Sequence, residues 1–314
     1  MDQSSQLNQP NGCIDQSSQL NRLNRFAAAH LDLEHNIDKM RIEANKLYQS
    51  KCRKFLESSH NEDLLLTPDE EALLRKVFTQ TGIRFGDDFR PLIWPSVQWT
   101  ALAYFKRFYL NQSTMEYFPK YLMITCYYLA LKVDEFNLTI DQFVENLRSG
   151  EREDNIKAIL SLEPEIMLNL DYQLTVHCPF RPFEGHMIDM KTKCRLDFDL
   201  DLIRPHSTEF FKKSLVGDAM LLYAPSQIAL AALKYGLEQT DQSKNLTQDL
   251  LKTYFKKLLD GDQSSVNSLY NRLDEICKVI WEQSRSVLPE QNTALETRKA
   301  DRNRETNDAA LVTK

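Results

Sequence analysis

Apolar residues recur at intervals of three and four through most of this chain, which is the spacing that places them on one face of an α-helix. The first predicted helix spans about residues 31–56. Its apolar face is formed by Leu33, Ile37, Met40, Ala44 and Leu47. Acidic residues early and basic residues late in this segment match the helix dipole. We expect one long helix that precedes the main helical repeats.

The second helix has a strong start signal. Thr67 is a typical N-cap, Pro68 suits the first helical position, and Glu70 completes a capping box. This helix is predicted to run to about Thr81.

Four more helices are predicted before residue 178. They cover about residues 96–110, 119–136, 139–148 and 152–170. The helix that begins at Pro119 is apolar on most faces, so we expect it at the centre of a bundle with Cys126 in the core.

The same pattern starts again after a turn at residues 177–179. Helices are predicted over about residues 182–193, 210–223, 225–239, 247–259 and 266–286. The proline-led third helix of each half ends alike, with Ala-Leu-Lys at 130–132 and at 232–234. These patterns indicate an all-α protein made of two stacked five-helix domains, with additional N- and C-terminal helices.

The chain therefore divides into five predicted parts. They are a disordered tail (1–25), an N-terminal helix and linker (26–66), a first helical domain (67–177), a second with a C-terminal helix (178–287), and a polar tail (288–314). Both tails have too few apolar residues to fold alone, so we expect them to be flexible.

Composition narrows the function classes. The 8 glycines among 314 residues favour helices, and a net charge of -6 disfavours a protein whose main task is to bind nucleic acid. The six cysteines form no C-x-x-C pair, so neither a zinc site nor a disulfide framework is indicated. Without an apolar run of 18 residues or a signal peptide, we expect an intracellular protein with no membrane span.

Catalytic motifs are missing from the sequence. It contains no G-x-G-x-x-G, P-loop or H-E-x-x-H pattern. Asp197, Asp199 and Asp201 resemble the start of a calcium loop, but Leu202 and Thr208 replace the required Gly and Glu. We therefore expect structural acids here, no metal or cofactor, and an interaction protein rather than an enzyme.

Four segments closely resemble the cyclin family, and its H type in particular. They are AYFKRFYLNQSTMEY (103–117), ALKVDEFN (130–137), HCPFRPFEGHMIDMKTK (177–193) and LLYAPSQIALAAL (221–233). The resemblance covers roughly residues 31–287. It implies two five-helix cyclin folds flanked by terminal helices, in agreement with the periodicity.

The resemblance also implies a function. H-type cyclins are non-catalytic subunits that bind and activate a cyclin-dependent kinase. With that kinase and a RING-finger assembly factor they form the CDK-activating kinase, which is also a module of transcription factor IIH. Its substrates are the activation loops of cyclin-dependent kinases and the C-terminal repeats of RNA polymerase II. A nuclear protein in cell-cycle control and transcription is implied, without direct contact to nucleic acid or membrane.

The kinase-binding residues that the resemblance implies are Lys132, Glu163, Tyr172 and Leu174. A kinase needs a Lys paired with the Glu of its helix αC, and a cyclin that prefers this active arrangement shifts the population toward it. We expect the heads of Lys132 and Glu163 to converge on one partly exposed patch beside that helix.

The sequence departs from the family pattern in two places. Pro164 stands where a helix interior is expected, and an interior proline removes a backbone hydrogen bond and kinks the axis. The segment PDEEALLRKVF also lacks the Met-Arg-Ala-Ile-Leu motif with which cell-cycle cyclins dock substrates, so that role is not implied.

Three alternatives stay open at this point. One is another transcriptional cyclin of the C, K or T type, although the PFRPFEG run favours H. A second is a DNA-binding protein of the transcription factor IIB type, which would carry a zinc ribbon and a basic face. A third is an all-α enzyme, which would need convergent titratable groups.

Overall fold

The structure is a computed structural model that describes residues 35–53, 65–240, 244–259 and 261–285. In these ranges the regular elements are helices and there is no β-strand, which confirms the all-α prediction. The predicted tails at 1–25 and 288–314, and Leu33 of the first predicted helix, lie outside the described residues.

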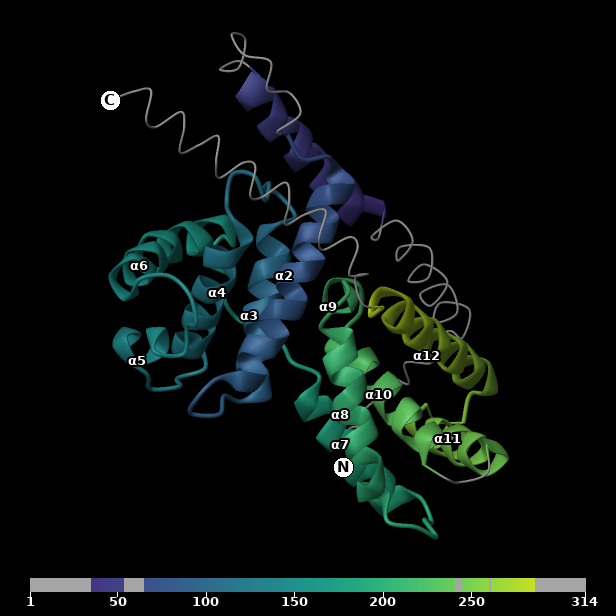
Figure 1. The fold of residues 1–314 in the computed structure, drawn as a ribbon. Coiled ribbons are helices and arrows are strands. Elements are labelled where there is room, and N and C mark those ends of the chain that lie inside the picture. The colour runs from purple at the N-terminus through teal and green to yellow at the C-terminus, as the bar shows by residue number, and fades with distance from the viewer. Residues whose placement is uncertain (1–34, 54–64, 241–243, 260, 286–314) are drawn as a thin grey trace, which may run out of the picture.

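The helices form two bundles, blue to teal and green in Figure 1. The first bundle contains α2 (Pro68–Asp88), α3 (Pro95–Phe108), α4 (Pro119–Val133), α5 (Ile140–Val144) and α6 (Arg152–Asn169). The second bundle contains α7 (Phe180–Lys193), the 3-10 helix η2 (Leu200–Ile203), α8 (Arg204–Ser214), α9 (Ala219–Leu222), α10 (Pro225–Gln239) and α11 (Lys244–Leu258). The last helix, α12 (Gln263–Gln283), packs on α8, α9 and α10.

Each bundle is built around its third long helix. In the first bundle α4 contacts α2, α3 and α6, and Leu122, Cys126 and Leu129 on it are buried. In the second bundle α10 contacts α7, α8 and α12 in the same way. The predicted central position of the helix that begins at Pro119 is confirmed.

The first helix of the bundle is longer than predicted. The capping box of Thr67 and Glu70 is present, but α2 passes Thr81 and ends at Asp88. Gly82 and Gly86 do not end the helix, because they face neighbouring side chains at the crossing with α3 and α4. A Cβ on Gly82 would lie 2.7 Å from the sulfur of Met123. These glycines permit close helix packing.

Two other predicted helices were wrong in extent. The segment predicted as one helix over residues 210–223 breaks at Gly217, between α8 and α9. A Cβ on Gly217 would lie 2.1 Å from Oε1 of Gln283, so the turn packs directly against α12. The helix predicted over residues 139–148 ends at Val144, because the Asn146 side chain exchanges two hydrogen bonds with the backbone of Arg90.

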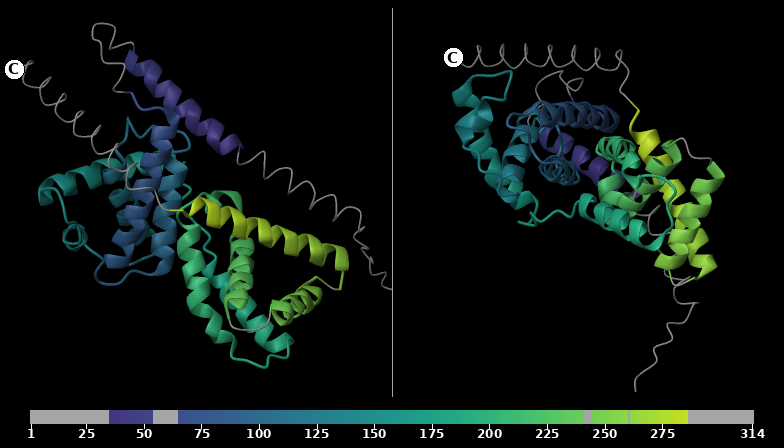
Figure 2. Two further views of the ribbon diagram at one scale, coloured as in Figure 1. Left: turned by 45° about the vertical axis from the view of Figure 1, so that its right-hand side comes forward. Right: turned by 90° about the horizontal axis from the view of Figure 1, so that it is seen from below.

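Residues 35–53 form the N-terminal helix, drawn in purple in Figures 1 and 2. Its buried face includes Ile37, Ala44 and Asn45, and the Asn45 amide donates a hydrogen bond to the carbonyl of Leu66 just before α2. Arg41 on the same helix reaches Asp218 in the α8–α9 turn. The N-terminal helix therefore contacts both bundles.

Candidate functional site

Lys132 and Glu163 come from different helices and meet. The Nζ atom of Lys132, at the end of α4, lies 2.5 Å from Oε1 of Glu163, in the middle of α6. The predicted convergence is therefore confirmed. The Lys132 side chain is 51% exposed, as expected. The expectation that Glu163 is also partly exposed was wrong, since its side chain is only 10% exposed. Glu163 is buried because it shares the inner face of α6 with Ile159 and Ile166.

Pro164 lies within α6, and the helix continues on both sides of it. Pro164 has no N–H to donate to the carbonyl of Leu160. Both residues are on the exposed side of α6, where water can donate a hydrogen bond to that carbonyl instead. The proline therefore leaves Glu163 in place against α4. The Lys132 ammonium pairs with Glu163, whereas Glu165 is exposed. The choice of Glu163 over its neighbour as the kinase-binding residue stays a prediction.

Tyr172 and Leu174 follow α6 and have different surroundings. Tyr172 is 66% exposed and has a positive φ of 56°, a conformation that non-glycine residues adopt rarely. Its backbone N–H donates to the carbonyl of Met167 at 2.9 Å, which closes the turn. Leu174 is half-buried against the core, and its carbonyl accepts a hydrogen bond from the Tyr104 hydroxyl. Of these two side chains, that of Tyr172 is the one with a large exposed surface.

An exposed apolar stripe on α6 was missed by the sequence reasoning. Leu160 is 50% exposed and Leu168 is 58% exposed, and Pro164 lies between them at helical spacing. Exposed apolar patches of this kind mark interaction surfaces. The four-residue spacing was visible in the sequence, but it could not be separated from the buried face of the same helix. We call this surface the α4–α6 face; it comprises Lys132, Val133, Leu160, Glu163, Pro164, Leu168 and Tyr172.

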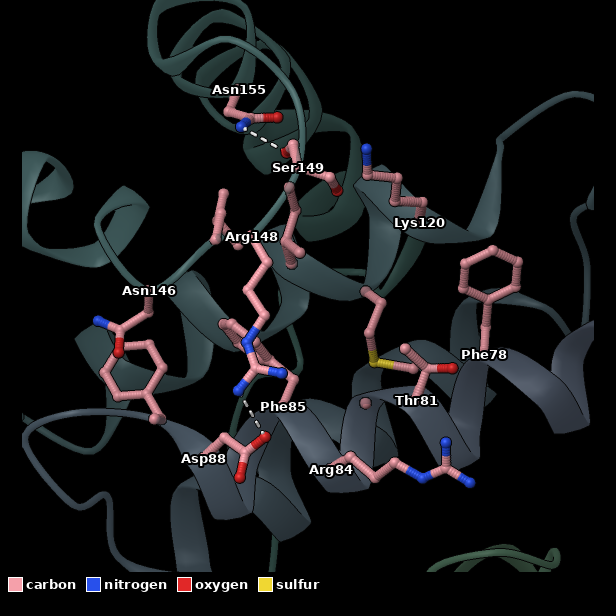
Figure 3. A pocket seen from close by; sticks show the side chains of 15 residues that line it. Phe78, Thr81, Arg84, Phe85, Asp88, Lys120, Asn146, Arg148, Ser149 and Asn155 are labelled. Atoms are coloured by element: carbon pink, nitrogen blue, oxygen red, sulfur yellow. Dashed lines mark hydrogen bonds and ion pairs between the residues drawn. The ribbon is translucent and has the colours of Figure 1, made fainter.

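The described residues also contain a cavity of about 320 Å³ between α2, α4 and the loop from α5 to α6 (Figure 3). Its lining is mainly apolar, and Asp88, the carboxylate that lines it, pairs with Arg148 at 3.0 Å. The Asn155 amide donates to the carbonyl of Ser149. No histidine or cysteine lines this cavity.

The acidic segment after α7 has a structural role. Asp199 accepts a hydrogen bond from the N–H of Asp201 and caps η2, while Asp201 pairs with Lys191 and Arg204. Among the described residues no group of three or more potential metal ligands occurs. Within the same ranges, no helix combines the length and apolar character that a bilayer crossing requires.

Comparison with known proteins identifies relatives over most of the chain. The family model for the cyclin C-terminal domain matches residues 178–282. Cyclin-H of Xenopus laevis is 35% identical over 260 residues, which cover 82% of this chain and 79% of the relative. This match favours the H type over the other transcriptional cyclins and over an unrelated enzyme.

Solved structures give the same result. A chain of the yeast TFIIK complex matches with a TM-score of 0.55 and 25% identity, covering 68% of this chain and 87% of that chain. A chain of the CAK complex from Chaetomium thermophilum bound to ATP-gamma-S matches with a TM-score of 0.66, covering 83% and 77%. At 23% identity the second match shows a shared fold. On sequence and fold together, the chain belongs to the cyclin H family.

Proposed function

We propose that this chain is the regulatory cyclin of a CDK-activating kinase and that it binds its kinase through the α4–α6 face. The observation that carries the proposal is the Lys132–Glu163 ion pair at the edge of an exposed apolar stripe. Its cationic member is half exposed and therefore accessible to a partner.

The surface has the chemistry that a kinase helix requires. The Lys132 ammonium has three N–H donors, and one of them donates to Glu163. The same ammonium lies 5.4 Å from the centre of the Tyr128 ring. Remaining donors can reach carbonyl or carboxylate oxygens of a partner. Leu160, Leu168 and Tyr172 supply the apolar area that a stable interface buries.

Activation then follows from differential binding. A cyclin that binds the active placement of helix αC more tightly than the inactive one shifts the kinase toward activity. Near-complete activation requires a preference of about 5.5 kcal/mol, which only an extended interface supplies. The cyclin itself takes no part in phosphoryl transfer, and we propose that it has no catalytic activity of its own.

The relatives support a proposal about the wider assembly. Similarity to chains of the CAK and TFIIK complexes supports a cyclin-dependent kinase as the partner. We further propose a RING-finger assembly factor and the transcription factor IIH core as partners, and a nuclear location. The substrates of the assembled kinase would be activation loops of cyclin-dependent kinases and the C-terminal repeats of RNA polymerase II.

Reconstitution tests the proposed function. The purified chain is mixed with a cyclin-dependent kinase of the CDK-activating type, and phosphorylation of a peptide from each substrate class is measured. Leu168→Glu places a charge on the α4–α6 face and is expected to abolish both binding and activation. Ile188→Glu on α7, where the side chain is 64% exposed, is the matched control and should activate normally. Equal activation by both variants would place the interface elsewhere.

A further inference from the structure

A second cavity lies where five elements meet, and none of these elements belongs to the α4–α6 face. It has a volume of about 260 Å³ and is lined by the N-terminal helix, α2, α3, the α8–α9 turn and the end of α12. Its charged lining residues are Asp38, Arg41, Arg75, Lys76, Lys106 and Asp218. We call it the junction cavity.

The junction cavity carries an excess of positive charge. Four cations and two carboxylates line it, and Glu71, which pairs with Arg75 at 3.5 Å, leaves the balance positive. The Glu71 carboxylate also accepts hydrogen bonds from Ser113 and from the N–H of Thr114, so its charge is shared. Lys106 is 5% exposed and the Arg75 side chain 12% exposed. Buried charge without a full complement of counter-charge is costly.

Burial is the main cause of a lowered pKa at two of these cations, Arg75 and Lys106. Burial and then the neighbouring charge of Arg41 lower the pKa of Arg75 to about 10. Burial lowers the pKa of Lys106 to about 8, although Asp218 acts in the opposite direction. Both groups would be stabilised by an additional anion.

A buried donor in the same place lacks an acceptor. Two guanidinium nitrogens of Arg41 donate to Asp218 at 2.7 and 2.8 Å, but its Nε–H is buried and has no hydrogen-bond partner among the described residues. Buried donors are normally satisfied by protein, water or ligand. An oxyanion in the cavity would supply the missing negative charge beside this unsatisfied donor.

We propose that the junction cavity binds a phosphate group. A tetrahedral dianion offers several acceptor oxygens, and cations from three elements, Arg41, Arg75 and Lys106, surround the space. The volume suffices for a phosphate and some water, since a water molecule takes about 30 Å³ of the liquid. The source is free inorganic phosphate or the phosphoryl group of a modified protein side chain, which share this chemistry.

Occupancy would join the N-terminal helix to both bundles, because the bound oxygens would contact groups from each of them. The site lies on elements other than the α4–α6 face, so the proposal does not depend on kinase binding. Phosphate would act on the cyclin alone.

Calorimetric titration and thermal unfolding of the full chain test the proposal. Inorganic phosphate should bind saturably and raise the melting temperature, whereas sodium chloride of equal ionic strength should not. Arg75→Gln removes one cation and should weaken binding by at least about tenfold. Arg84→Gln is the matched control, because Arg84 is an exposed arginine of the same helix outside the cavity. Lys76→Gln, at a half-buried lining position, is a second variant that should also weaken binding.

Blocked phosphoserine distinguishes the two sources. Tighter binding of blocked phosphoserine than of inorganic phosphate assigns the site to a phosphorylated side chain, and the reverse order assigns it to the free ion. An equal effect of chloride, or binding unchanged in both Arg75→Gln and Lys76→Gln, would overturn the proposal.

Discussion

Arg41 in the N-terminal helix and Asp218 in the α8–α9 turn are 177 positions apart, yet two hydrogen bonds of 2.7 and 2.8 Å join them. Burial alone would raise the pKa of Asp218. The hydrogen bond from Arg41 and the charges of Arg41, Lys106 and Arg75 outweigh it and hold this pKa well below its usual value. The backbone N–H of Asp218 donates to Gln283 of α12 as well. Asp218 thus connects both ends of the described chain, through its carboxylate to Arg41 and through its backbone N–H to Gln283.

Asp218→Asn should destabilise the protein strongly. It leaves buried cations without their counter-charge, and breaking a buried pair costs about 3–5 kcal/mol. Urea unfolding measures the difference. Asp201→Asn is the control, because its ion pairs are about half exposed and should contribute about 0–1 kcal/mol. A change for Asp218→Asn no larger than that of the control would refute the role of this residue.

The contribution of Asp218 has a defined pH window. Its pKa in the folded state lies below the ordinary value of 3.8, so the unfolded chain takes up the proton first as the pH falls. The stabilisation is therefore complete above that ordinary value and is lost as the pH falls through the folded-state value. The free energy of unfolding should be measured from about pH 5 to about pH 2, the range over which such a carboxylate titrates. In Asp218→Asn the part of its decrease that comes from this carboxylate should be missing.

Lys106 should give the opposite pH dependence. Its pKa is lowered from 10.5 to about 8, so between these values the unfolded chain binds the proton and the folded chain does not. Stability should therefore rise with pH across this window, relative to a Lys106→Met variant. The charges that face this amine are Asp218, Arg41 and Arg75. Denaturant unfolding of both proteins at several pH values gives the difference, and a flat difference would contradict the assignment.

Lys132 and Glu163 should be coupled in kinase binding. Lys132→Ala and Glu163→Gln are each expected to weaken the complex by about 2–5 kcal/mol, because the half-exposed Lys132 becomes desolvated in the interface and the buried Glu163 holds its ammonium in place. The double variant should lose less than the sum, since the two side chains contact each other. Surface plasmon resonance with an isolated kinase measures the affinities. Glu165→Ala is the control; if that variant alone weakens binding, the site residues are wrongly assigned.

Two helical glycines should respond oppositely to alanine. In Gly86→Ala the new Cβ would lie 2.5 Å from Nε2 of Gln98 and 2.8 Å from the Tyr127 hydroxyl, so the free energy of unfolding should fall by about 1–3 kcal/mol. Gly185→Ala in α7 meets no atom within 4 Å and should gain up to about 1 kcal/mol from higher helix propensity. Thermal unfolding checks both, and equal effects would exclude the close packing of α2.

Local signals in the sequence predicted most helices but not how far each extends. The capping box at Thr67 and the prolines at 95, 119 and 225 mark helix starts, because they act on the backbone within one turn. The prediction left Gly86 outside the helix that was expected to end at about Thr81, and it placed Gly217 inside a helix, because a glycine has opposite effects in a helix crossing and in a turn. Only the neighbours in space, Gln98 and Gln283, decide between them.

For the candidate site, the sequence predicted which residues meet but not how exposed they are. The pairing of Lys132 with Glu163 came from resemblance to a family, since no local spacing relates residues 31 positions apart. The exposure of Leu168 and the burial of Glu163 depend on the rotation of α6 against α4. The junction cavity was not foreseen at all, because it requires the N-terminal helix, α3 and the α8–α9 turn to meet.

The Arg41–Asp218 connection also sets an order of events during synthesis. Ribosomes add about 5–20 residues per second from the N-terminus, so Arg41, Arg75 and Lys106 emerge well before their shared carboxylate. During this interval the nascent first bundle carries these cations in water, without the partner that later buries them. Docking of the N-terminal helix across both bundles must therefore wait until the α8–α9 turn has left the ribosome.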